Sequence, residues 1–245
     1  MSYGSSMRAN GKTMRSKVSG RVALVCIASP WLAACSRSDE TTVPAPITAP
    51  APTKPGDESA ALTPEQIARL VRPHSPVFGA AKAPVTVVEV LDPACEACKA
   101  FAPVVEQLLF AYPEDVRVVV RYADFHPVSL QALRLLEAAR AQGKVHELLT
   151  ALFERQQEWA SHSAPNPLQA WKIAADVGIN VARARKDALA SSVDDMLNLE
   201  AADLVALKVA RTPTFFVNGK PLPTFGAQQL MDLVASEVKT SKSKQ

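Results

Sequence analysis

Two apolar runs, Val85–Leu91 and Val116–Tyr122, stand out along the chain because apolar residues occupy both of their alternating faces. A strand with one face in water would alternate apolar and polar residues. Runs of this kind therefore predict strands of a central sheet that helices cover on both sides. A third strand is predicted at Thr214–Val217, where an Asn218-Gly219 turn and a short return strand complete a hairpin.

Apolar residues recur at helical spacing between and after these strands. A first short helix is predicted to begin at Thr63-Pro64, since Thr63 can cap it, Pro64 suits the first position and Gln66 completes a capping box. The other predicted helices cover 101–109, 130–136, 148–153, 167–177, 195–207 and 227–238. The order of strand, helix, strand, helical block, hairpin and helix indicates an α/β fold.

The composition changes ahead of the first predicted helix. Residues 36–62 consist mainly of Pro, Ala, Thr and Ser, with almost no large apolar side chains. Such a segment cannot bury enough apolar surface to offset the entropy lost on folding, and its prolines favour an extended conformation. We expect residues 35–62 to form a tether, residues 63–240 to form one domain, and residues 241–245 to form a polar tail.

The first 34 residues have the features of an export signal: basic residues, then a mostly apolar stretch from Val22 to Ala33. Leu32-Ala33-Ala34-Cys35 resembles a bacterial lipobox, which implies cleavage before Cys35, lipidation of Cys35 and a lipid anchor in the membrane. The alternative is an ordinary secretory signal cut after Ala34, which leaves Cys35 as a free thiol. The apolar stretch is short for a membrane helix, which needs about 20 residues.

Loss of this leader changes the net charge of the chain. The chain has 27 basic and 24 acidic residues, and the leader holds five of the basic ones and none of the acidic ones. The remainder has 22 basic against 24 acidic residues, a net charge of −2. It contains no block of basic residues interleaved with aromatic ones, so we expect no nucleic-acid partner.

Cys95 and Cys98 lie three positions apart where the first strand gives way to a helix. The N-terminus of a helix stabilises a thiolate, and a second thiol one turn away can close a small disulfide ring. This pair therefore predicts a redox site that exchanges disulfides without a cofactor. The alternative, half of a structural zinc site, would require two further ligands, and the sequence offers no second pair at the usual spacing.

Together, the Cys-x-x-Cys after the first core strand, the mid-chain helical block and Thr212-Pro213 before the hairpin resemble the DsbA-like branch of the thioredoxin superfamily. The resemblance covers about residues 75–238 and implies a thioredoxin-like fold with a helical insertion. It implies that Cys95 is the nucleophile and that Cys98 is the more buried resolving cysteine. It also implies that Thr212-Pro213 forms the cis-proline loop facing the disulfide, although a trans proline at a strand start is an alternative.

Glu89, six residues before Cys95, matches the acidic residue beneath the active site of DsbA-like proteins. The resemblance implies that Glu89 exchanges a proton with Cys98, which requires a carboxyl whose pKa burial has raised. A structural ion pair with Arg121 at a sheet edge is the alternative.

Glu96 and Ala97 stand between the two cysteines, where strongly oxidising members of the branch carry a histidine. A carboxylate beside Cys95 disfavours its thiolate, so we expect a weaker oxidant. Thr212 before the proline also occurs in isomerase-like members, which leaves the direction of exchange open.

These features predict an envelope thiol-disulfide oxidoreductase on the periplasmic side, anchored by a lipid on Cys35. Its expected partners are cysteine-containing envelope proteins and a membrane redox partner. The alternative is a non-catalytic metallochaperone or thiol-binding protein in which Cys95 and Cys98 bind Cu(I).

Overall fold

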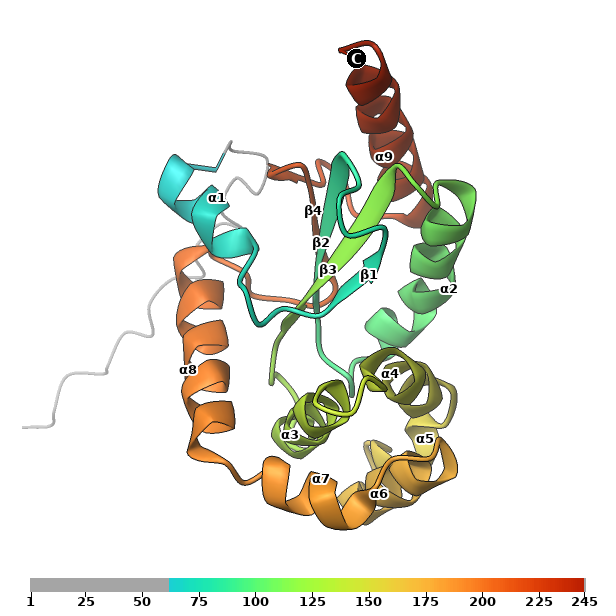
Figure 1. The fold of residues 1–245 in the computed structure, drawn as a ribbon, viewed down its shortest axis with the longest axis vertical. Helices are drawn as coiled ribbons and strands as arrows, with labels where there is room; N and C mark the ends of the chain where they lie inside the picture. Colours follow the sequence, from blue (N-terminus) through green and yellow to red (C-terminus); the bar gives the residue numbers. More distant parts are fainter. Residues whose placement is uncertain (1–61, 245) are drawn as a thin grey trace, which may run out of the picture. The chain divides into compact units, whose positions relative to one another are not determined.

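A five-stranded mixed sheet lies at the centre of residues 62–244, the part of the chain that the computed structural model describes (Figure 1). The strand order is β1-β3-β2-β4-β5. β2 runs parallel to β3, and the other neighbouring strands pair antiparallel. The strands are β1 (Val77–Gly79), β2 (Val85–Leu91), β3 (Val116–Tyr122), β4 (Thr214–Val217) and β5 (Lys220–Pro221). The predicted leader, Cys35 and the tether up to residue 61 lie outside the described residues.

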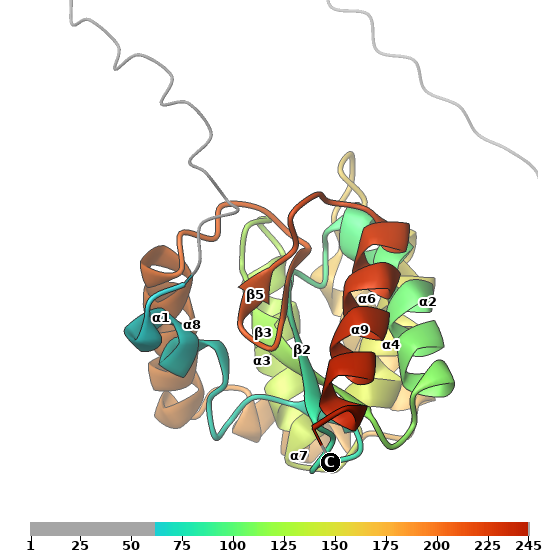
Figure 2. The same ribbon diagram turned by 90° about the horizontal axis from the view of Figure 1, so that it is seen from above.

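Helices α2 (Glu96–Ala111) and α9 (Ala227–Lys242) pack on one face of the sheet (Figure 2). Their apolar side chains meet the first half of β2 and β3, for example Leu108 and Leu230 against Val87. All three of these side chains are fully buried. These contacts hold α2 against the strand that precedes it, β2.

Helices α1 (Pro64–Leu70) and α8 (Ser191–Ala206) cover the opposite face (Figure 2). The predicted capping box of α1 is present, with Thr63 and Gln66 bonding reciprocally. Leu70 and Leu204 pack with Val88 and Val90, which point away from α2 because side chains alternate along a strand. The two layers leave β2 covered on both sides, as its apolar sequence predicts.

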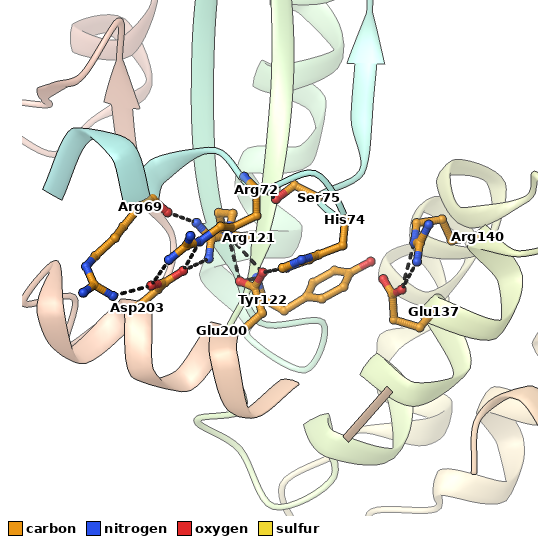
Figure 3. Close-up of polar contacts among 10 residues, drawn as sticks. All are labelled: Arg69, Arg72, His74, Ser75, Arg121, Tyr122, Glu137, Arg140, Glu200 and Asp203. Atoms are coloured by element: carbon orange, nitrogen blue, oxygen red, sulfur yellow. Dashed lines mark hydrogen bonds and ion pairs between the residues drawn. The ribbon is translucent and has the colours of Figure 1, made fainter. Parts of the chain in front are cut away.

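An ionic network ties α1 and α8 to the sheet (Figure 3). Arg121 of β3 is fully buried and lies 2.9 Å from both Glu200 and Asp203 of α8. Asp203 also binds Arg69 at 2.9 Å and Arg72 at 2.7 Å. Burial raises the pKa of Asp203, but hydrogen bonds from the three arginines outweigh burial and hold it below its ordinary range. The buried charges are thus compensated within the network.

The helical insertion packs over the carboxyl ends of β2 and β3, next to the turn after β2 that carries the cysteines (Figure 1). Trp159 is its largest fully buried side chain, and its indole N–H donates to the Leu152 carbonyl at 2.9 Å. The insertion consists of α3 (Ser129–Arg140), α4 (Val145–Glu154), α5 (Gln156–Trp159), α6 (Pro167–Asp176) and α7 (Val181–Asp187). The architecture is a thioredoxin-like α/β fold with a helical insertion, as predicted.

The boundaries of β2, β3 and β4 agree with the prediction, whereas β1 was not predicted. β1 has only three residues and pairs solely with β3. It ends at Gly79, where φ is +86° and an added Cβ would come within 2.8 Å of the Val116 carbonyl oxygen. Glycine therefore allows the close approach of β1 to β3.

Five helices extend beyond their predicted ranges: α2, α3, α4, α8 and α9. α8 begins four residues before Asp195, and α9 continues from Val238 to Lys242. The extra turn of α9 lacks apolar residues, but Lys242 lies 2.7 Å from Asp115, and cations stabilise helix C-termini.

None of the helices within residues 62–244 is both long and apolar enough to cross a membrane.

Candidate active site

The two cysteines occupy the first turn of α2, next to the end of β2. Cys95 caps the helix and Cys98 lies inside it. Both are free thiols, with 7% of Cys95 and none of Cys98 exposed. Of the two thiols, only Cys95 has surface in contact with solvent.

Hydrogen bonds of Asp92 hold the turn between β2 and α2. Its buried carboxylate accepts from the backbone N–H of Ala94 at 2.8 Å and of Phe125 at 2.7 Å. It also accepts from the His126 backbone at 3.1 Å, from the His126 ring at 2.9 Å and from the Ser129 hydroxyl. One carboxylate thus binds the cysteine turn to the segment that leads into α3.

Gln156 of α5 supports the same turn from the helical insertion. Its fully buried amide donates to the carbonyl oxygens of Pro93 at 3.1 Å and Cys95 at 3.0 Å. Sequence reasoning missed both Asp92 and Gln156. Asp92-Pro93 was available as a turn signal, because an aspartate often bonds the backbone two residues on. Nothing in the sequence links Gln156 to a turn so far away.

The pKa of Cys95 is lowered to about 5. The main cause is the hydrogen bond from the Cys98 thiol, which burial opposes. The Thr212 side chain and the backbone N–H groups of Cys98 and Ala97 lower the pKa further. Cys95 is therefore a thiolate at neutral pH, the reactive form of a cysteine.

Cys98 has the opposite character. Burial is the main cause that raises its pKa well above the ordinary value, and its hydrogen bond to Cys95 adds to this. The negative charges of Cys95 and Glu89 raise it further, while the Asp92 backbone N–H, 3.5 Å from the Cys98 sulfur, lowers it. Cys98 therefore needs a base before it can attack.

Thr212-Pro213 lies beside Cys95, and its peptide bond is cis. The Cys95 sulfur lies 3.4 Å from the Thr212 carbonyl oxygen. The alternative of a trans proline is therefore wrong.

Glu89 lies in β2, the middle strand of the sheet, with 4% of its surface exposed. Burial, and then the charge of Glu106, raise its pKa to about 8. The alternative of an edge position paired with Arg121 is wrong. Val120 is the register partner of Glu89 on β3, so Arg121 points to the opposite face and binds α8.

Glu96 has partners in the helical insertion. Its carboxylate accepts from the Gln157 amide at 3.1 Å and lies 3.7 Å from the His162 ring. Glu96 is not among the groups that set the pKa of Cys95. The Glu96 carboxylate thus binds side chains of the helical insertion.

Within residues 62–244, no three His, Cys, Asp or Glu side chains are grouped so that they could hold a metal ion.

The sequence profile of the thioredoxin family matches residues 72–233. Among curated proteins, the chain is 31% identical over 162 residues to the Na(+)/H(+) antiporter NhaA 1 of Mycobacterium sp. (strain KMS). It is 31% identical over 146 residues to the antiporter NhaA of Herminiimonas arsenicoxydans. These matches take in 62% and 60% of this chain but only 25% and 22% of the antiporters. The chain thus spans about a quarter of the length of these relatives.

Solved structures give longer matches. A thioredoxin-like oxidoreductase from Silicibacter pomeroyi DSS-3 is 26% identical, with a TM-score of 0.61 over 73% of this chain and 99% of that one. Alpha-DsbA1 from Wolbachia pipientis is 16% identical, with a TM-score of 0.65 over 73% and 98%. The catalytic domain of ScsC from Proteus mirabilis is 20% identical, with a TM-score of 0.60 over 71% and 98%. The profile match covers most of the described residues, and the solved structures share the fold. The chain therefore belongs to the thioredoxin family and has the DsbA-like form of its fold.

Proposed function

We propose that this protein is a thiol-disulfide oxidoreductase that exchanges the Cys95–Cys98 disulfide with cysteines of partner proteins. The observation that carries the proposal is the contrast between the two thiols. Cys95 keeps 7% of its surface exposed and its pKa is lowered to about 5, whereas Cys98 is completely buried and its pKa is raised. One thiol can therefore attack a partner while the other stays protonated until a mixed disulfide has formed.

The exchange proceeds in two steps. The Cys95 thiolate attacks one sulfur of a partner disulfide, a mixed disulfide forms, and the other partner sulfur leaves as a thiolate. Cys98 then gives its proton to Glu89 and attacks the Cys95 sulfur. The Cys95–Cys98 disulfide forms, the second partner sulfur leaves, and two electrons have passed to the partner. The reverse sequence oxidises a partner dithiol.

The position and character of Glu89 support its role as the base for Cys98. Its charge contributes to the raised pKa of Cys98, so the two groups interact. Its own pKa of about 8 makes its carboxylate a stronger base than an ordinary glutamate. Because the pKa of Cys98 is higher still, Glu89 would accept the proton only as Cys98 attacks the mixed disulfide.

The reduction potential would decide the direction of exchange. A low pKa of Cys95 stabilises the reduced form and favours an oxidant. Glu96 places a negative charge beside Cys95 in the sequence, although it is not among the groups that set the pKa of Cys95. Glu96→His should make the disulfide more oxidising, and a change of about 30 mV corresponds to about 1.4 kcal/mol for this two-electron couple. Equilibration of both proteins with glutathione measures the difference.

The location we propose is the periplasmic side of the cell envelope, where disulfides persist. The leader and the Leu-Ala-Ala-Cys35 sequence support a lipid anchor followed by a tether. Envelope proteins with cysteines would be the substrates, and a membrane redox protein would restore the site. If the anchor exists, Cys35→Ser will remove the protein from the detergent phase in phase separation. Membrane association of a normally processed Cys35→Ser chain would refute the anchor.

The test of the exchange activity uses a reduced, unfolded protein with several cysteines as substrate. The oxidised chain should oxidise it while Cys95 and Cys98 become reduced in equal amounts. Cys95→Ser should abolish the reaction. A native chain that transfers no disulfide in either direction would refute the proposed function.

A further inference from the structure

A small cavity lies beside Glu89, between β2, α2 and α4. Its volume is about 30 Å³, enough for one water molecule. Most of its wall is apolar, formed by side chains such as Phe78, Leu91, Val105, Leu149 and Phe153. The wall also contains three side chains that titrate: Glu89, Glu106 and His146.

Glu106 and His146 form a pair at the protein surface. Glu106 of α2 and His146 of α4 lie 2.7 Å apart, and their side chains are 52% and 41% exposed. The His146 ring packs against Phe78 of β1, with 4.4 Å between ring centroids. The pair therefore borders both the solvent and the cavity.

The strand neighbours of Glu89 offer no proton acceptor. Val120 and Phe215 flank it on β3 and β4 and carry no charge. The arginines and carboxylates of α1 and α8 lie on the opposite face of the sheet. Among the described side chains that line the cavity, Glu106 and His146 are the titratable groups besides Glu89, and both reach the solvent.

Glu89 needs such a route because it is almost completely buried. With a pKa of about 8, it holds a proton at neutral pH and must release that proton before it can accept one from Cys98. After each exchange, the proton taken from Cys98 must also leave. Apolar walls do not carry protons, whereas carboxylate, imidazole and water can.

We propose that Glu106 and His146 form the solvent end of a proton path that serves Glu89. The path runs from Cys98 to Glu89, through one water molecule in the cavity, to Glu106 and His146, and then to bulk water. One proton leaves for each Cys95–Cys98 disulfide formed, and one enters when the disulfide is reduced. Glu106 and His146 touch no reacting sulfur, so they are relay residues. This inference rests on the proposed function.

The test follows resolution of the mixed disulfide between Cys95 and glutathione. The full chain carries Cys26→Ser and Cys35→Ser throughout, so that Cys95 and Cys98 are its only thiols. The reduced protein is mixed with oxidised glutathione, quenched with acid at intervals and analysed by mass spectrometry across a range of pH. The variants are Glu106→Gln and His146→Gln. The matched control is Glu147→Gln, an exposed glutamate next to His146 that does not line the cavity.

We expect each relay variant to lower the maximum rate constant of resolution by about ten-fold. Imidazole buffer should restore the rate, because a small diffusible base can replace the missing relay. Formation of the mixed disulfide by Cys95 and the behaviour of Glu147→Gln should not change.

Three results would overturn the relay. The relay variants could match the Glu147→Gln control. Their pH profiles could shift in opposite directions with unchanged maxima, which would mean that the pair acts only through its electric field on Glu89. Resolution could also be slow without rescue by imidazole, which would mean a structural role. A native chain that forms neither a transient mixed disulfide at Cys95 nor the Cys95–Cys98 disulfide would instead refute the proposed function itself.

Discussion

Replacing Glu89 by glutamine should stabilise the folded protein by an amount that grows with pH. The ordinary pKa of 4.5 is raised to about 8 by burial and by the charge of Glu106. Between these values the folded protein keeps a proton that the unfolded chain has lost. Stability therefore falls as pH rises through this window, and the Glu89→Gln protein lacks that loss.

The size of the effect follows from the pKa shift. Each unit is worth about 1.4 kcal/mol, so relative to low pH the variant should gain about 3 kcal/mol at pH 7. Above pH 8 the gain should level off at about 5 kcal/mol. Below the ordinary pKa both states hold the proton, and ionisation contributes nothing.

Urea unfolding of the reduced proteins, followed by tryptophan fluorescence at several pH values, measures the gain. Glu114→Gln, which removes an exposed carboxylate in the loop after α2, is the control and should show no such trend. The same Glu89→Gln protein should resolve mixed disulfides slowly, since glutamine cannot accept the Cys98 proton. If the stability curves of the native and Glu89→Gln proteins run parallel across this range, Glu89 is ionised at neutral pH and the proposed acid-base role is wrong.

Three further predictions concern the thiolate, the cysteine turn and the ionic network. Ultraviolet titration should give a Cys95 pKa of about 5, and Cys98→Ala should raise it by about one unit or more; an unchanged value would contradict stabilisation by Cys98. Asp92→Asn turns an amide toward backbone donors and should cost about 3 kcal/mol in thermal or urea unfolding, whereas exposed Asp124→Asn should cost little. Asp203→Asn removes one of the two buried carboxylates that bind Arg121 and should cost about 3 kcal/mol, whereas Asp187→Asn, in an exposed pair with Arg183, should cost less than about 1 kcal/mol. Equal losses would mean that the buried network stabilises the fold no more than an exposed ion pair does.

The core strands could be predicted to the residue, because their short runs are rich in valine and have apolar residues on both alternating faces. β1 could not, since its three residues become a strand only where the free edge of β3 meets them. The helical insertion could be predicted as a block of apolar periodicity, but its short helices α5 and α7 have too few turns to produce a clear period.

The candidate site shows the same limit. The spacing of Cys95 and Cys98 can be read locally and points to a redox site, whereas the role of Glu89 was implied only by the resemblance to DsbA-like proteins. The alternative partner of Glu89 was wrong because the face on which Arg121 points depends on the register between β2 and β3. Asp92, Gln156 and the Glu106–His146 pair depend on segments that only the tertiary fold brings together.

Trapping of the mixed disulfide tests the central claim most directly. The full chain with Cys26→Ser, Cys35→Ser and Cys98→Ala is mixed with a protein that carries a reducible disulfide, alkylated and mapped by mass spectrometry. A stable mixed disulfide through Cys95, absent when Cys98 is restored, is the predicted result. A mixed disulfide that persists equally with Cys98 present, or none at Cys95, would contradict the division of roles between the two thiols.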